Sequence, residues 1–75
     1  MELLTEKEKV TEFVSWCIEE YAASHKKSGS ETAELFEQVG VLDYLFEFAD
    51  VLHTQGKDYI LKDIDEFIAK RQFHV

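Results

Sequence analysis

The amino-acid sequence predicts an all-α protein, a compact orthogonal bundle of four helices around a central buried helix at about residues 42–53. Three glycines, Gly29, Gly40 and Gly56, divide the chain into four segments, as glycines do just past helix ends. Within the segments, apolar residues recur at helical spacing. A chain of 75 residues is expected to form one helical domain, over residues 1–75.

The first segment predicts a helix from about Glu6 to Ser24. Thr5 followed by Glu8 has the spacing of a capping box, in which each residue satisfies a free backbone N–H of the first turn. One helical stripe contains Val10, Phe13, Val14, Cys17, Ile18 and Tyr21. Trp16 falls off the edge of this stripe. Cys17 lies in the middle of it and is expected to be a small core residue rather than a nucleophile.

A polar loop over residues 25–30 separates this helix from a second, shorter one. Ser28 or Ser30 is expected to cap it, since a serine oxygen accepts a hydrogen bond from the first turn. Its apolar stripe contains Ala33, Leu35, Phe36 and Val39, with three glutamates on the opposite face. Gly40 is expected to end the helix.

The third segment predicts the central helix, from about Leu42 to His53. Its only polar strip is formed by Asp43, Glu47 and Asp50, which fall within one narrow wedge at helical spacing. A helix that is apolar nearly all round is expected to be buried on most sides. Gly56 is expected to end it.

The last segment predicts a helix from about Ile60 to Gln72. Its start is open, because either Asp58 or Asp63 could cap it. Residues 58–61 could also be extended, since they include strand-like residues that do not alternate with polar ones.

The charge of the chain restricts its partners. The net charge is −8, and residues 30–56 contain no Lys or Arg. Nucleic acid and anionic membranes would both repel such a chain, whereas a soluble, basic protein partner would fit it. No apolar run approaches the ~20 residues of a membrane span. With no export signal and a single cysteine, we expect a cytoplasmic protein.

The candidate site residues are aromatic and acidic. Trp16, Tyr44 and Phe48 lie at the margins of their stripes or on a helix with more apolar faces than four helices can cover. Exposed aromatic residues are typical of interfaces, so self-association as a homodimer is also expected. The full set of predicted interaction residues is Trp16, Tyr44, Phe48, Asp43, Glu47, Asp50 and His53. No catalytic motif is present, and we expect neither a cofactor nor an enzymatic activity.

Two alternative functions stay open. The first is a small metal-dependent or catalytic site around Asp50 and His53, whose weakness is that no second set of ligands is evident. The second is a DNA-binding regulator that uses Lys26, Lys27 and the last helix. The helix that a helix-turn-helix motif would place in the groove is the acidic one, which argues against this function.

Several runs resemble a family of short, uncharacterised bacterial proteins, a domain of unknown function. They are Phe13-Val-Ser-Trp-Cys-Ile-Glu-Glu-Tyr21, Gly40-Val-Leu-Asp-Tyr-Leu45, Leu52-His-Thr-Gln-Gly56, and Tyr59-Ile60 followed by Asp63-Ile-Asp65. The resemblance covers about residues 13–71 and implies no catalytic residue. It implies a gene neighbourhood shared with proteins similar to ADP-ribosyltransferases, and hence a role as partner or antitoxin-like neutraliser. The sequence therefore favours a non-catalytic, acidic protein-interaction module.

Overall fold

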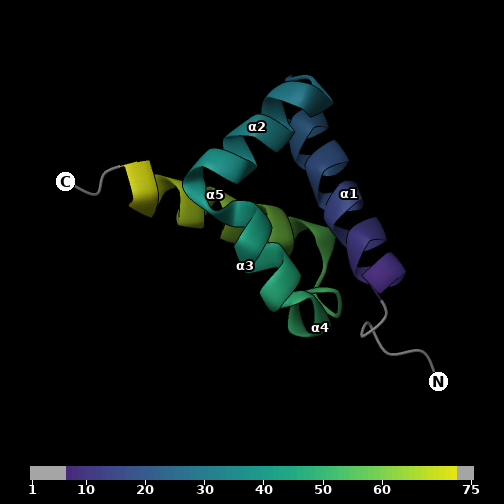
Figure 1. Cartoon of the computed structure of the whole chain (residues 1–75). Helices are drawn as coiled ribbons and strands as arrows, with labels where there is room; N and C mark the ends of the chain where they lie inside the picture. The colour runs from purple at the N-terminus through teal and green to yellow at the C-terminus, as the bar shows by residue number, and fades with distance from the viewer. Residues whose placement is uncertain (1–6, 73–75) are drawn as a thin grey trace.

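The computed structural model describes residues 7–72, and all regular secondary structure in that range is helical. The helices are α1 (Lys7–Ser24), α2 (Gly29–Val39), α3 (Val41–Glu47), α4 (Ala49–Leu52) and α5 (Lys57–Gln72) (Figure 1). The prediction of an all-α fold is confirmed. The predicted cap at Thr5 and the first predicted helical residue, Glu6, lie outside the described residues.

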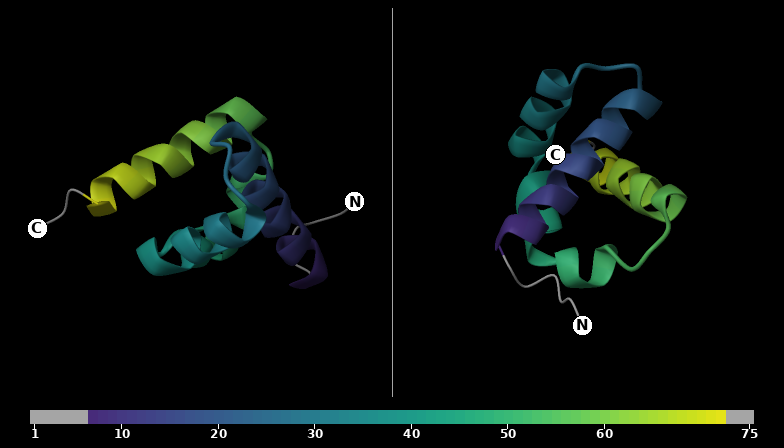
Figure 2. Two further views of the ribbon diagram at one scale, coloured as in Figure 1. Left: turned by 90° about the horizontal axis from the view of Figure 1, so that it is seen from above. Right: turned by 90° about the vertical axis from the view of Figure 1, so that its right-hand side faces the viewer.

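The helices cross at steep angles around one core. In Figures 1 and 2, α1 and α2 diverge from the loop that joins them, α5 crosses behind α3, and α4 lies beside the N-terminal end of α1. The core draws residues from α1, α2, α3, α4 and α5. The largest fully buried side chains are Phe36, Leu45, Ile60, Ile64, Val41, Thr32 and Cys17. Burial of this apolar surface is what stabilises so short a chain.

Helix α1 presents the predicted stripe to the core. Val14, Cys17 and Tyr21 are buried, and the other three stripe residues pack against them. Burial raises the pKa of the Cys17 thiol to about 12, so the thiol stays protonated and acts as a small apolar group. Trp16 lies off the stripe as predicted, is 37% exposed, and stacks on Phe13.

Both ends of α2 carry the expected capping residues. The backbone N–H of Glu31 donates to Ser28 Oγ at 3.0 Å, and the N–H of Ser28 donates to Glu31 Oε1 at 3.1 Å. These two hydrogen bonds form a capping box, so the N-cap of α2 is Ser28 and not Ser30. Gly40 ends the helix with φ +89°, and its N–H donates to the carbonyl of Phe36.

The predicted single helix over residues 42–53 is wrong, because the chain breaks at Phe48. Phe48 has φ −108° and ψ 19°, and α4 is a separate helix of 4 residues. Neither proline nor glycine marks the break. Aromatic and β-branched residues with modest helix propensity surround it, and the bend lets α4 contact α1 and bury Ala49 and Leu52.

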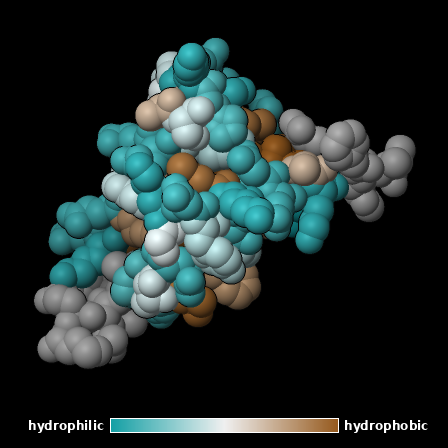
Figure 3. Space-filling model, turned by 180° about the vertical axis from the view of Figure 1, so that it is seen from behind, coloured by the Kyte–Doolittle hydropathy of each residue, from teal (hydrophilic) through white to brown (hydrophobic). Residues whose placement is uncertain are grey.

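This segment is also less buried than predicted. Its inner face, with Val41, Leu45, Ala49 and Leu52, is buried. By contrast Phe46 is 45% exposed, Phe48 44% and Val51 61%. The physical reason is that the neighbouring helices cover only one side of α3 and α4. Viewed from behind, most of the surface is hydrophilic, and one of the small hydrophobic areas lies at the lower edge, over α4 (Figure 3).

Helix α5 begins earlier than predicted, at Lys57 rather than near Ile60. Residues 58–61 are therefore helical. The carbonyl of Gly56 accepts the first helical hydrogen bond, from the N–H of Ile60 at 3.0 Å. Asp58 lies in the first turn, where a carboxylate interacts favourably with the helix dipole, and Asp63 lies inside the helix. The early start places Ile60 and Ile64 together in the core.

Candidate interaction surface

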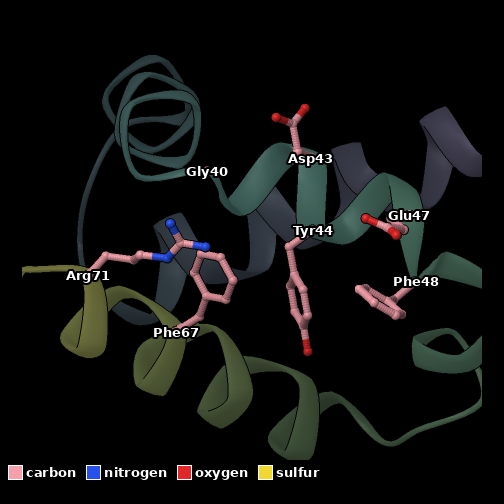
Figure 4. Close-up of a pocket in the computed structure, with 7 residues that line it drawn as sticks. All are labelled: Gly40, Asp43, Tyr44, Glu47, Phe48, Phe67 and Arg71. Carbon is pink, nitrogen blue, oxygen red and sulfur yellow. The ribbon is translucent and has the colours of Figure 1, made fainter. Parts of the chain in front are cut away.

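A shallow pocket of about 300 Å³ opens between α3 and the C-terminal half of α5. We call it the α3–α5 pocket. The side chains that line it are Asp43, Tyr44, Glu47, Phe48, Phe67 and Arg71 (Figure 4). The first four come from α3 and the residue that follows it, and the last two come from α5.

Tyr44 is the central side chain of the pocket, because it joins the two walls. It points from α3 toward α5 (Figure 4), and its ring stacks on Phe67 with centroids 4.8 Å apart. The ring of Phe48 lies 5.3 Å away on the other side. The hydroxyl of Tyr44 donates to Asp63 Oδ2 at 2.5 Å. Three aromatic rings thus form one continuous apolar wall, held in place by a hydrogen bond.

Charged groups surround this wall on both sides. Asp43 and Glu47 are exposed and one helical turn apart on α3, and Asp43 points away from α5 in Figure 4. Among residues 7–72, neither carboxylate has a hydrogen-bond or ion-pair partner. The guanidinium of Arg71 lies over the ring of Phe67, 4.6 Å from its centroid. With two carboxylates against one guanidinium, the pocket carries a net negative charge.

The structure brings together four of the seven predicted interaction residues, Asp43, Tyr44, Glu47 and Phe48. The other three are elsewhere. The break at Phe48 moves Asp50 onto α4, away from the acidic strip to which it was assigned. His53 is the exposed C-cap of that helix, and Trp16 lies on α1. The strip predicted on one helix is therefore divided between two.

Residues 7–72 contain no group of three or more His, Cys, Asp or Glu side chains placed to hold a metal ion. Asp50 and His53, the predicted alternative site, are both exposed and do not line the α3–α5 pocket. Lys26 and Lys27, proposed for DNA contact, are exposed in the turn between α1 and α2. Within the same range, no helix has the length and apolar character needed to cross a membrane.

A serine, a histidine and an aspartate meet where α1 ends beside α5. Ser24 Oγ lies 2.8 Å from His25 Nδ1, and His25 Nε2 lies 3.1 Å from Asp65 Oδ1. The same carboxylate oxygen accepts a hydrogen bond from the hydroxyl of Tyr21 at 2.8 Å. The His25 ring also stacks on Tyr21, with centroids 3.9 Å apart.

The geometry of this cluster suits a structural brace better than a nucleophilic site. Ser24 Oγ donates to the carbonyl of Tyr21 at 3.1 Å, and His25 Nδ1 lies 3.1 Å from the same carbonyl. A general base would need an unprotonated ring nitrogen facing the serine, whereas His25 Nδ1 also faces this carbonyl, which can only accept a hydrogen bond. In addition, a helix C-terminus presents carbonyls, whereas an oxyanion needs N–H donors. The cluster ties the end of α1 to α5.

Sequence reasoning missed the α5 half of the pocket, Phe67 and Arg71. A signal was present, since Tyr59, Asp63, Phe67 and Arg71 follow one another at intervals of four residues and so share one helix face. The sequence alone does not show that this face of α5 lies against α3. The His25–Asp65 contact was missed for the same reason, because its partners lie far apart in the chain.

Fold and surface together define a small all-α protein with an acidic, aromatic-lined pocket. The chain belongs to the family of proteins of unknown function DUF3791, which matches it over residues 12–71. The resemblance to a domain of unknown function is thereby confirmed. No curated protein and no solved structure matches the chain significantly.

The pocket hydrogen bond predicts a loss of stability at alkaline pH. Burial, and then the hydrogen bond to Asp63, raise the pKa of Tyr44 to about 12, from an ordinary value of about 10. A raised pKa means that the fold favours the neutral phenol, so this contribution is complete below pH 10 and is lost as the pH rises through 12. Urea titrations across this range should show a falling free energy of unfolding.

The matched variant is Tyr44→Phe, which keeps the ring and removes the phenol. Its free energy of unfolding should fall less steeply over the same pH range. Some pH dependence should remain, because Tyr21 and Cys17 also have raised pKa values. An identical pH dependence in the two proteins would show that Tyr44 is not held in its neutral form by the fold.

Proposed function

We propose that this protein is a non-catalytic interaction module that binds a basic protein partner through the α3–α5 pocket. The observation that carries this proposal is the composition of the pocket, where three aromatic rings and two unpartnered carboxylates lie together at the surface. Aromatic side chains are the residues that most often dominate binding energy at interfaces.

The two kinds of residue have different parts in the proposed contact. Tyr44 is held by Phe67 and Asp63, so little conformational freedom is lost when a partner covers it. Phe48 is 44% exposed and offers apolar area that a partner would bury. The charge of −8 would speed the encounter with a basic partner, and Asp43 and Glu47 would fix its orientation.

We further propose that the partner is a toxin-like enzyme encoded by a neighbouring gene in a bacterium, with both proteins in the cytoplasm. The support for this finer proposal is the resemblance described above, in which relatives are encoded beside proteins similar to ADP-ribosyltransferases. The acidic surface supports it in part, because complementary charge would speed the encounter with a basic target and disfavour other partners.

Affinity capture tests the proposed function. A tagged wild-type chain is used to capture proteins from a lysate of the native host, which are identified by mass spectrometry. The pocket variant, Asp43→Asn with Glu47→Gln and Phe48→Ala, should lose the captured partner. The control variant, Glu34→Gln with Glu37→Gln, removes the same number of charges from exposed positions of α2 and should retain it.

Self-association is measured in parallel, because a homodimer formed through this surface would compete with the partner. Sedimentation of the wild-type chain and the pocket variant at tens of micromolar determines whether such a dimer forms. A partner that the wild type and the pocket variant capture equally would exclude the pocket as the interface. Absence of any specifically captured protein would count against the interaction module itself.

A further inference from the structure

We infer that the α3–α5 pocket takes the side chain of a single arginine from the partner, stacked on Phe48 and paired with Glu47, while Asp43, one helical turn away, adds to the negative charge. The inference rests on the proposed function and specifies the chemistry of the contact. It follows from the chain's own arginine, from the pair of carboxylates, and from the charge of the surrounding helices.

The pocket already contains a guanidinium–aromatic contact. Arg71 places its guanidinium over Phe67 at 4.6 Å from the ring centroid, within the ~6 Å over which a cation is attracted by a ring face. Tyr44 and Phe48 have no such cation on their rings among residues 7–72. Tyr44 lies between Phe67 and Phe48, so Phe48, which is 44% exposed, is the ring that offers the partner the same kind of surface that Phe67 offers to Arg71.

The carboxylates complete a site for a guanidinium. Asp43 and Glu47 are four positions apart on α3, so their Cβ atoms lie roughly 5–6 Å apart on one face. A planar guanidinium can stack on a ring and donate two parallel hydrogen bonds to a carboxylate at the same time. A lysine ammonium has no plane to stack and no fork of donors, so arginine should bind more tightly than lysine.

The charge around the pocket favours a cation over an anion. Residues 30–56, which include α2, α3 and α4, contain six acidic residues and no Lys or Arg. Arg71 is the one basic side chain that lines the pocket in the described structure. It would repel an incoming guanidinium, whereas it would attract an acidic side chain. Arg71 therefore provides a test that separates the two kinds of occupant.

The test uses the full chain, labelled with ¹⁵N, and three blocked peptides that differ only at a central arginine, lysine or glutamate. The arginine peptide should cause saturable shifts in the backbone amides of residues 43–48 and 67–71, with a dissociation constant on the order of a few millimolar for one side chain. The lysine peptide should bind at least threefold more weakly, and the glutamate peptide should cause no saturable shift there.

Variants locate the site. Asp43→Asn with Glu47→Gln should weaken arginine binding at least tenfold, while Glu34→Gln with Glu37→Gln should leave it unchanged. Arg71→Gln should keep or strengthen arginine binding, because it removes a repulsive charge. All these positions are exposed, so the amide spectra of the variants should retain the folded dispersion of the wild type.

Three results would overturn the inference. The first is arginine binding that survives neutralisation of Asp43 and Glu47. The second is tighter binding of the lysine or glutamate peptide than of the arginine peptide. The third is the absence of amide shifts at residues 43–48 at arginine-peptide concentrations well above the expected dissociation constant. If a partner is still captured through the pocket despite any of these results, the proposed function stands and only the inference that the pocket binds an arginine is wrong. If no partner is captured either, both the proposed function and the arginine inference are wrong.

Discussion

Replacing Leu45 by alanine should lower the free energy of unfolding by about 2–5 kcal/mol, the range found for leucines in protein cores. Leu45 is fully buried at the centre of α3, where α1, α2 and α5 all contact that helix. Truncation would leave a cavity that the short, crossing helices have little freedom to close. If a domain of this size has a total stability of about 5 kcal/mol, a loss at the upper end of this range would leave about half of the variant unfolded.

Phe46 provides the matched control, since it is the next residue in the same helix and is 45% exposed. Phe46→Ala should cost about 1 kcal/mol or less, because much of the ring already contacts water. Urea titration followed by the fluorescence of Trp16 measures both variants. Equal losses at the two positions, or a loss well under 1 kcal/mol at Leu45, would contradict the assignment of α3 to the core.

Replacing Gly40 by alanine should cost about 1–2 kcal/mol, the penalty of a left-handed backbone for a residue with a Cβ atom. Gly40 has φ +89° and is the single residue between α2 and α3. A Cβ atom built there meets nothing within 4 Å, so the cost would come from the backbone conformation and not from a clash. Thermal unfolding monitored by circular dichroism measures the effect.

Gly29 is the control, because it is the first residue of α2 and its φ is not positive. Gly29→Ala should leave the stability unchanged or raise it by up to about 1 kcal/mol, since alanine restricts the unfolded chain. A similar loss at both glycines would show that the left-handed turn at Gly40 is not what alanine disrupts.

The sequence predicted those parts of the fold that depend on local pattern. The stripe of α1, the capping box at Ser28 and the turn at Gly40 follow from residue type and spacing within one or two helical turns. The break at Phe48 does not, because Val41, Leu45, Ala49 and Leu52 have the spacing of one face of a continuous helix. Contacts of α4 with α1 decide between the two conformations, and such contacts depend on where distant helices lie.

The pocket shows the same division. Its α3 side was predicted from an acidic strip and surplus aromatic residues, both of which are properties of one helix. Phe67 and Arg71 complete it only because α5 crosses beside α3, which no periodicity within α5 specifies. The strip itself was predicted too long, since Asp50 belongs to it only if the helix is continuous. The sequence therefore predicted most of the helices, but it did not predict which helix packs against which.

The hydrogen bond from Tyr44 to Asp63 has a consequence for the thermodynamics of the whole chain. It joins residues 19 positions apart, so the pocket exists only while α5 is docked on α3. A ligand of such a pocket binds the folded state alone, and at one hundred times its dissociation constant it would add about 2.7 kcal/mol to the free energy of unfolding. For so small a domain this is a large fraction of the total. The unfolded fraction of the chain, which is the form that proteases degrade, would then be about one hundred times smaller when the partner is present in that excess.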